Sequence, residues 1–124
     1  VGDGAFGTML YAKGISPDAC VEELCLTEPE TIASILQDYK NVGAQVLETN
    51  SFCLNRHKLQ KFNLSKKTRE MALASAKIAR SVAGQELFVA GSIGPIVRRK
   101  REMDEYTSDD LLKMFLDQYY ENCR

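Results

Sequence analysis

Hydrophobic and polar positions along the chain follow two periods, and their alternation predicts strands followed by helices. Ala44–Thr49 and Leu87–Ser92 are short apolar runs of strand length. The second run is nearly continuously apolar, which is typical of a strand covered on both faces. Val1–Asp3 is expected to be the tail of an earlier strand, and Gly4, Gly7 and Gly14 to mark the loop after it.

A helical pattern follows each predicted strand. The first helix is expected to begin after Leu26, with Thr27 as N-cap, Pro29 in the first turn and Glu30 completing a capping box, and to end at Gly43. Its apolar face, at helical spacing, consists of Ile32, Ile35, Leu36 and Tyr39.

Two further helices are expected after a loop over Asn50–Ser65, which includes His57 as an exposed residue. One spans Lys66–Ala83, is stopped by Gly84, and is predicted to bury Met71, Ala74, Ile78 and Val82. The other begins near Thr107 or Ser108, with Asp109 and Asp110 in its first turn. It is predicted to bury Leu112, Phe115, Leu116 and Tyr119.

The order of these elements predicts an α/β fold with parallel strands and right-handed crossovers. A doubly wound open sheet and a (β/α)8 barrel share this order, and periodicity does not separate them. The 124 residues are few for a complete barrel, which typically has about 250.

Charge and composition narrow the expected partners. The formal net charge is −1, so no global field favours nucleic acid or an anionic membrane. The basic run Arg98–Arg101 precedes Glu102, Asp104 and Glu105, and is interpreted as a solvated loop. No apolar run approaches the roughly 20 residues of a membrane span, and no signal peptide opens the sequence. A cytoplasmic protein is expected.

The four cysteines, Cys20, Cys25, Cys53 and Cys123, are too sparse for a disulfide-stapled fold. Cys20 and Cys25 are five positions apart, without a neighbouring His to complete a tetrahedral metal site. We interpret all four as reduced thiols and expect no metal ligands in this segment.

Polar or glycine-rich segments follow all three predicted strands, where parallel α/β folds place their ligands. Asp3–Thr8 combines a carboxylate with glycines whose backbone N–H groups can converge on an anion. Together they suit the two charged ends of an amino acid, although a tight turn capped by Asp3 is an equally simple interpretation. Glu48–Phe52 follows the second strand, and Glu48 either faces a polar cavity or is solvated or ion-paired. Gly91–Pro95 follows the third strand as a rigid turn.

These segments, in this order, resemble the homocysteine S-methyltransferase family. Asp3–Leu10 is similar to its opening D-G-[AG]-[MF]-G-T-x-L, Glu48–Asn55 to its E-T-N-T-F-x-x-N, and Gly91–Pro95 to its G-S-[IL]-G-P. The intervening Glu22–Leu24 and Leu26–Glu30 are also similar to members. The nearest subfamilies are the homocysteine module of cobalamin-dependent methionine synthase and the bifunctional homocysteine S-methyltransferase/methylenetetrahydrofolate reductase.

The resemblance implies that residues 1–124 are an N-terminal fragment, about three βα units, of a (β/α)8 TIM barrel, truncated at both ends. It implies that Asp3 meets the homocysteine ammonium group and that backbone N–H groups of Gly4, Ala5 and Phe6 meet its carboxylate. Thr49, with Glu48 and Ser51 beside it, would shape the pocket near the sulfur. Homocysteine, a methyl donor and downstream domains of the same polypeptide are the implied partners.

The implied reaction is methyl transfer to homocysteine thiolate, forming methionine. In the family, zinc held by three thiolates, one from a middle strand and two from a late G-G-C-C turn, keeps that sulfur deprotonated. The four cysteines of this chain match neither motif, so the segment alone is expected to be inactive. Cobalamin or methyltetrahydrofolate is a possible methyl source. Two alternatives stay open: a stand-alone α/β module that binds a small anion or amino acid, and an interaction domain.

Overall fold

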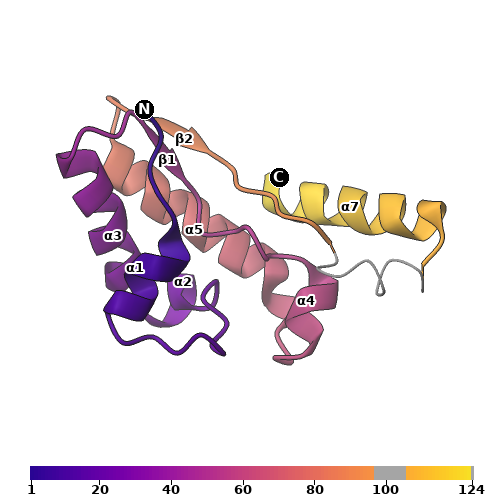
Figure 1. The fold of residues 1–124 in the computed structure, drawn as a ribbon. Helices are drawn as coiled ribbons and strands as arrows, with labels where there is room; N and C mark the ends of the chain where they lie inside the picture. Colours follow the sequence, from indigo (N-terminus) through magenta and orange to yellow (C-terminus); the bar gives the residue numbers. More distant parts are fainter. Residues whose placement is uncertain (97–105, 124) are drawn as a thin grey trace.

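The computed structural model describes residues 1–96 and 106–123, without side-chain detail for residues 121–123 (Figure 1). The basic run Arg98–Arg101 therefore lies outside the described residues. The elements, in chain order, are α1 (Phe6–Ala12), α2 (Leu24–Thr27), α3 (Pro29–Asn41), β1 (Val46–Glu48), α4 (Arg56–Gln60), the 3-10 turn η1 (Ser65–Lys67), α5 (Thr68–Ala83), β2 (Phe88–Ala90) and α7 (Ser108–Cys123).

The strands are parallel, as the sequence predicts, but shorter than expected. β1 pairs with β2 so that Leu47 lies opposite Val89. Gly2 forms a parallel bridge with Val46, and the Asp3 N–H donates to the Val46 carbonyl at 3.0 Å. The tail of the first predicted strand therefore lies beside β1, with β2 on the other side. Within the described residues, the sheet comprises two strands and this single bridge.

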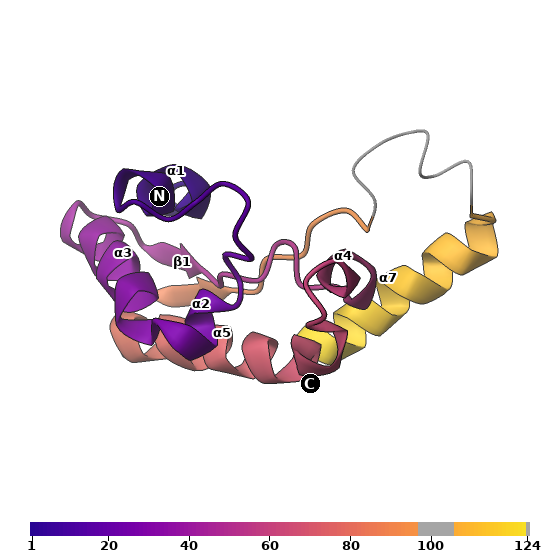
Figure 2. The same cartoon turned by 90° about the horizontal axis from the view of Figure 1, so that it is seen from below.

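Helices α3 and α5 lie side by side against β1 and form the main core with it (Figures 1 and 2). The predicted inner face of α3 is confirmed for Ile32, Ile35 and Leu36, which have no exposed surface. They pack with the fully buried Leu10 of α1 and Leu47 of β1. Tyr39, the fourth predicted residue, is half-buried at the edge of this core. A second cluster, under α4 and the start of α5, contains Leu54, Leu59, Leu64, Met71 and Ala72.

The buried face of α5 differs in part from the predicted one. Met71 is fully buried, but Ala74, Ile78 and Val82 are only partly buried and lie at the edge of the core. The positions that face the core most directly carry small side chains: Ala72, Ser75, Ala79 and Ala83. Small residues let α5 approach its neighbours closely, and the larger ones fill the flanks. Ranking positions by hydrophobicity alone misses this preference.

Three expected boundaries are wrong. Thr27 ends α2 instead of capping α3, because its hydroxyl donates back to the Glu23 carbonyl at 3.3 Å within α2. The loop predicted after the first strand contains α1, and Gly7 lies inside that helix. The predicted loop over residues 50–65 contains α4, whose first turn is capped by the Asn55 side chain accepting from the Lys58 N–H at 2.8 Å.

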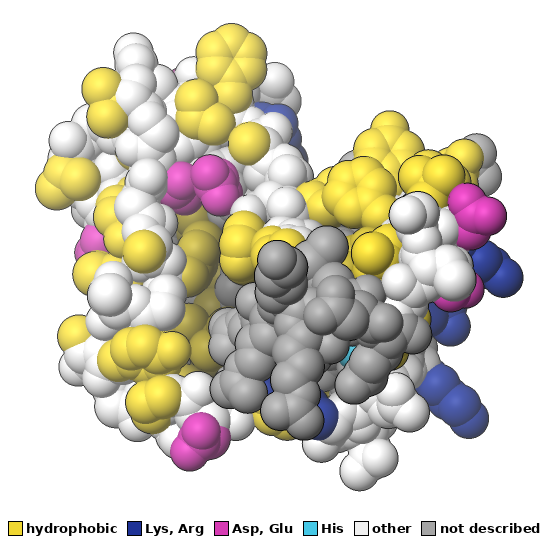
Figure 3. Space-filling model, turned by 45° about the vertical axis from the view of Figure 1, so that its right-hand side comes forward, with side chains coloured by type: hydrophobic (Ala, Val, Ile, Leu, Met, Phe, Trp, Pro, Cys, Tyr) yellow, Lys and Arg dark blue, Asp and Glu magenta, His cyan; other side chains and the backbone are white. Residues whose placement is uncertain are grey.

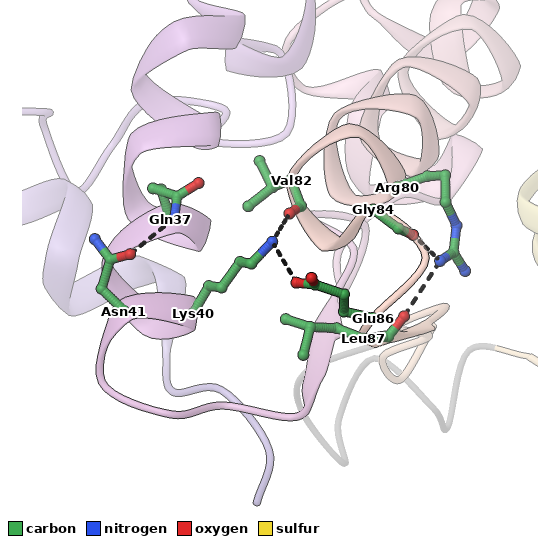
Figure 4. Close-up of polar contacts among 8 residues, drawn as sticks. All are labelled: Gln37, Lys40, Asn41, Arg80, Val82, Gly84, Glu86 and Leu87. Carbon is green, nitrogen blue, oxygen red and sulfur yellow. Dashed lines mark hydrogen bonds and ion pairs between the residues drawn. The ribbon is translucent and has the colours of Figure 1, made fainter.

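The third strand is not covered on both faces. Phe88 is 75% exposed, and the other two residues of β2 are half-buried. β2 is therefore more apolar than its burial among the described residues would require. The turn before β2 is firmly held: Lys40 Nζ donates to the Val82 carbonyl at 2.9 Å, and Arg80 Nη1 donates to the Leu87 carbonyl at 3.2 Å (Figure 4).

Helix α7 begins where the sequence predicts, but the residues expected to be buried are exposed. Thr107 and Asp110 cap each other reciprocally, since the Asp110 carboxylate accepts from the Thr107 N–H (3.0 Å) and Thr107 Oγ1 accepts from the Asp110 N–H (3.1 Å). The Thr107 hydroxyl also donates to Asp110 Oδ2 at 2.6 Å, and this hydrogen bond, with the one from the Thr107 N–H, lowers the pKa of Asp110. The exposed residues are Leu112 (58%), Phe115 (45%), Leu116 (41%) and Tyr119 (47%).

The opposite side of α7 packs on α5 instead, with Gln118 only 2% exposed and Met114 half-buried. The helical spacing of the apolar residues in α7 is as predicted, but the face that is buried is a different one. The described residues offer no second surface that could cover the wider apolar face. Hydrophobic side chains gather on this part of the molecule (Figure 3).

Replacing Ile35 with Ala should lower the free energy of unfolding by about 2–5 kcal/mol, because a fully buried side chain leaves a cavity at the α3–α5 contact. Urea denaturation measures the change. Val42→Ala is the matched control, since Val42 is 82% exposed, and it should cost less than about 0.5 kcal/mol. Equal effects of the two substitutions would contradict the described core.

Candidate functional site

The parallel register brings the ends of the three strand segments to one edge of the sheet. The Asp3 carboxylate reaches across to β1, where Oδ2 accepts from the Glu48 N–H at 2.8 Å. The Thr49 N–H then donates to the Ala90 carbonyl of β2 at 2.9 Å. Asp3 and Glu48, which are 45 positions apart in the sequence, thus lie beside each other. We call this edge of the sheet, where the three segments end, the strand-end edge; parallel α/β folds place their ligand sites at such an edge.

Partial burial raises the pKa of Asp3, and the nearby Glu48 carboxylate raises it further. The hydrogen bond from the Glu48 N–H acts in the opposite direction, and the net effect is upward. A carboxylate has about four lone-pair positions, so the backbone hydrogen bonds of Asp3 leave capacity for a cationic partner. Asp3 is thus a fixed acidic group whose charge is incompletely compensated.

Gly4 is required by the close approach of Tyr39 from α3. A Cβ atom at Gly4 would lie 2.7 Å from Tyr39 Oη and 2.9 Å from the ring. The Tyr39 hydroxyl donates to the Ala5 carbonyl at 3.0 Å, which fixes the backbone where α1 begins. Ala5 is the N-cap of α1, so the N–H groups of the following residues, starting with Phe6, have no acceptor within the helix.

Thr49, Ser51 and Ser92 form a closed ring of hydrogen bonds between the second and third strand ends. Ser92 N–H donates to Thr49 Oγ1 (3.0 Å), and Ser51 Oγ donates to the Ser92 carbonyl (2.7 Å). Because the Ser51 proton is used in this way, Thr49 Oγ1 must donate to Ser51 Oγ across their 2.7 Å separation. Thr49 and Ser51 are 6% and 3% exposed. Their hydroxyls are therefore occupied in holding the strand ends together.

Glu48 itself is exposed, which agrees with the interpretation that its carboxylate is solvated. Because the Glu48 carboxylate is exposed to water, there is no desolvation free energy that a partner would have to offset. Of the seven residues that the sequence points to, Asp3, Glu48, Thr49 and Ser51 are brought together by direct or adjacent hydrogen bonds. Gly4, Ala5 and Phe6 form the neighbouring loop and helix start.

Sequence reasoning missed the role of Glu22, which is 5% exposed. Its Oε1 accepts from the Cys53 N–H at 3.0 Å, and the Cys20 thiol lies 3.8 Å from Oε2. Asn50 adds a second connection, donating to the Val21 carbonyl at 2.8 Å. Both hold the segment before α2 against the end of β1. The sequence carries no signal that separates the buried Glu22 from the neighbouring Glu23, which is half-buried.

A cavity of about 340 Å³ lies beside this segment, with Cys20, Glu22, Cys53 and Lys58 among its lining residues. None of the seven predicted site residues lines it. His57, expected on an exposed loop, instead lies on α4 at the cavity, half-buried, with Nδ1 3.4 Å from the Tyr106 hydroxyl.

Cys20, Cys25 and Cys53 form no disulfide bond, and burial dominates the chemistry of the first two. Burial raises the pKa of Cys20 to about 11, and it also raises the pKa of Cys25. A protonated thiol is a poor metal ligand. Among residues 1–96 and 106–120, whose side chains the structure describes, no group of three His, Cys, Asp or Glu could hold a metal ion, so a zinc ion does not fit there.

The parallel pairing of β1 with β2 and the Gly2–Val46 bridge define a parallel α/β protein whose strand ends lie at one edge. The family model for homocysteine S-methyltransferase matches residues 1–122, and the chain belongs to that family. None of the helices in the described segments is long and apolar enough to cross a bilayer.

Individual relatives agree with this assignment. The chain is 34% identical over 107 residues to methionine synthase of Mycobacterium tuberculosis (strain ATCC 25618 / H37Rv), covering 77% of this chain and 9% of that protein. Methionine synthase of Mycobacterium leprae (strain TN) matches to the same extent. The chain therefore spans about a tenth of the length of these curated relatives.

Solved structures show the same fold. The metallated form of the Escherichia coli homocysteine methyltransferase MmuM superposes with a TM-score of 0.67 at 23% identity, covering 94% of this chain and 49% of that one. Its oxidized form gives a TM-score of 0.64 at 22% identity, with 48% of that chain covered. The chain is thus an α/β fragment that matches about half of a TIM-barrel enzyme; the described strands do not establish the predicted count of three βα units.

Replacing Thr49 with Val should lower the free energy of unfolding by about 1–3 kcal/mol, because the Ser92 N–H loses its acceptor and Ser51 Oγ loses its donor in a buried place. Chemical denaturation measures this loss. Thr27→Val, at an exposed position on α2, removes only one local hydrogen bond and should change stability much less. Indistinguishable effects would mean that the ring does not hold the strand ends.

Alkylation of Cys20 by iodoacetamide should stay slow and keep accelerating up to about pH 11, because only the thiolate reacts and burial holds the proton. Half-buried Cys53 should be labelled first; peptide mass spectrometry follows both. Since the folded-state pKa of Cys20 is above its unfolded value, this thiol's contribution to stability should be lost as pH rises from about 9 to about 11. A Cys20 rate that levels off near pH 9 would contradict the burial.

Proposed function

We propose that this chain supplies one wall of the homocysteine site in a methyltransferase that transfers a methyl group to the homocysteine sulfur and so forms methionine. The observation that carries the proposal is the Asp3 carboxylate, held at 2.8 Å by the Glu48 N–H beside the start of α1. Family membership over residues 1–122 and the methionine synthase relatives support the reaction. They favour it over a stand-alone anion-binding module or an interaction domain.

The two charged ends of homocysteine match the two halves of the strand-end edge. Asp3, whose carboxylate accepts from the Glu48 N–H, would also accept from the ammonium group. The backbone N–H groups of the Gly4, Ala5 and Phe6 segment would donate to the carboxylate, because α1 supplies them with no acceptor. Gly4 has a second role in this arrangement: it admits the Tyr39 ring that fixes the Ala5 carbonyl.

Thr49 and Ser51 would contribute by position more than by direct hydrogen bonding. Their hydroxyls are committed to the ring with Ser92, so the ring would hold the pocket wall at the sulfur end in a fixed shape. Glu48 is exposed beside Asp3 and would add negative potential for the ammonium group. Preformed binding groups of this kind reduce the entropy that must be lost on binding.

Zinc, which the family resemblance implies, would be held by residues outside this chain, since the described residues do not fit it. When bound, zinc keeps a thiol deprotonated at neutral pH. Cobalamin or methyltetrahydrofolate is the proposed methyl source, and a cytoplasmic location is proposed with it.

The exposed outer edge of β2 and the apolar face of α7 fit the proposal that residues 1–124 are the first part of a (β/α)8 barrel. Phe88 on β2 and Leu112 on α7 are 75% and 58% exposed. A following strand and helix would cover these surfaces, since unpaired edge strands and broad apolar faces are unfavourable in water. The domain would then continue beyond the barrel units described.

Asp3→Asn in the full-length protein should lower kcat/KM for homocysteine by about 10- to 100-fold, the value of a hydrogen bond to a charged group. Steady-state assays with homocysteine varied measure the effect, which should lie mainly in KM. Asp18→Asn, at an exposed position in the loop before α2, is the matched control. Unchanged saturation by homocysteine in the Asp3 variant would remove Asp3 from the site.

The same variant tests the pH dependence. Homocysteine must bind to ionised Asp3, so affinity should decrease as pH falls through the Asp3 pKa, which burial has raised above the usual value of 3.8. Calorimetric titration at decreasing pH should therefore show the loss beginning at higher pH than for an ordinary aspartate. The Asp3→Asn protein, already weak, should show no such step.

A further inference from the structure

The cavity of about 340 Å³ beside α4 is lined by two cysteines from different segments of the chain. Cys20 belongs to the segment before α2, and Cys53 belongs to the loop between β1 and α4. None of the seven residues predicted for the homocysteine site lines this cavity. It therefore holds two sulfur atoms that the proposed function does not use.

The two thiols lie beside groups of opposite charge. Cys20 Sγ is 3.8 Å from Glu22 Oε2, whereas Cys53 Sγ is 4.0 Å from Lys58 Nζ. Burial raises the pKa of Cys20 to about 11, and the Glu22 charge adds to this effect. The nucleophilic form of cysteine is the thiolate, which a neighbouring ammonium group stabilises. Of the two sulfur atoms, the one in Cys53 is therefore placed to react.

Lys58 is half-buried, and among residues 1–96 and 106–120 it forms no ion pair with a carboxylate. Its ammonium group donates to the Pro95 carbonyl and to Cys53 Sγ, and lies 5.9 Å from the centre of the Phe52 ring. An ammonium group has three N–H donors, so one remains for an anion that enters the cavity. The positive charge of Lys58 is thus partly removed from water without an acidic partner.

The other charged residues of the cavity also favour an anionic molecule. Exposed Lys61 and half-buried His57 add two basic side chains to the lining. Glu22 is the one acid among the described lining residues, and its two carboxylate oxygens already face the Cys53 N–H and the Cys20 thiol. The volume lies at the lower end of the range for small-molecule sites, roughly 300–1,000 Å³. A small molecule that bears a carboxylate therefore fits the cavity by charge and by size.

We propose that Cys53 is a site of reversible S-thiolation, and that the cavity admits a small disulfide with carboxylate ends, of the type of glutathione disulfide. The Cys53 thiol loses its proton to water, and its sulfur attacks one sulfur of the disulfide. The incoming S–S bond breaks as the new one forms, and the departing half leaves as a thiolate that takes a proton from water. Cys53 is oxidised and the departing half is reduced, so no further oxidant is required. The site does not depend on the proposed function.

The test compares two disulfides on the full-length protein: 3,3′-dithiodipropionate, with carboxylate ends, and cystamine, with ammonium ends. Mass spectrometry of the tryptic peptide 41–56, in which Cys53 is the only cysteine, measures the rate of thiolation. Each rate is divided by the rate for the same cysteine in urea-unfolded protein, which removes the difference in intrinsic reactivity. The normalised rate should be about fivefold higher for the dicarboxylate, the upper effect of an ion pair between partly exposed groups.

Lys58→Met should remove most of this preference, because an uncharged chain of similar length replaces the ammonium group, whereas Lys58→Arg should keep it. Lys66→Met is the matched control, since Lys66 is exposed on η1 and does not line the cavity, and its preference should equal that of the wild type. If Lys58→Met lowers the melting temperature, the wild type alone decides: added sodium chloride should reduce the preference, because salt screens the charges.

Equal normalised rates for the two disulfides in the wild type would overturn the proposal, and so would a preference that neither Lys58→Met nor salt reduces. Thiolation of Cys20 before Cys53 would also overturn it, because both cysteines line the same cavity. Excess 2-mercaptoethanol should return peptide 41–56 to its unmodified mass, as thiol–disulfide exchange requires. A modification that resists this treatment would contradict a mixed disulfide at Cys53.

Discussion

The hydrogen bond from the Glu48 N–H to the Asp3 carboxylate is the interaction on which the strand-end edge depends. It extends the Gly2–Val46 bridge by a side-chain contact, where the backbone of the first segment leaves the sheet to enter α1. Asp3 therefore both joins two chain segments and presents an acidic group. The pKa of Asp3 is raised because burial disfavours the charged carboxylate, and the hydrogen bond from the Glu48 N–H does not fully offset this effect.

The remaining strand ends are fixed by groups that expose little surface. The ring of Thr49, Ser51 and Ser92 satisfies two hydroxyl groups and a backbone N–H together, so each of these polar groups has a hydrogen-bond partner. Glu22 does the same for the Cys53 N–H. Rigid elements behind the edge, chiefly α3 and the small-residue face of α5, leave these polar groups little freedom to move. Such a scaffold suits a site that must hold a flexible amino acid in one orientation.

Much of this architecture is readable from the sequence, because it depends on local chemistry. The α3 core face follows from the spacing of Ile32, Ile35 and Leu36, and the parallel order follows from alternating elements. The grouping of Asp3 with Glu48 and Thr49 follows from the rule that ligands meet strand ends. The ring with Ser92 could not be predicted, since it depends on side-chain directions that only the folded register sets. The burial of Glu22 and Gln118 was equally inaccessible, because a polar residue gives no sign in the sequence that tertiary contacts will enclose it.

Helix α7 shows why amphipathic period and buried face are separate questions. Its apolar positions outnumber those that a single contact with α5 can cover, so one face must stay exposed in the described residues. The face that is covered is the one that places Met114 and Gln118 over the start of α5. If further barrel units cover Leu112 and Phe115, as proposed, the face of α7 that packs on α5 need not change.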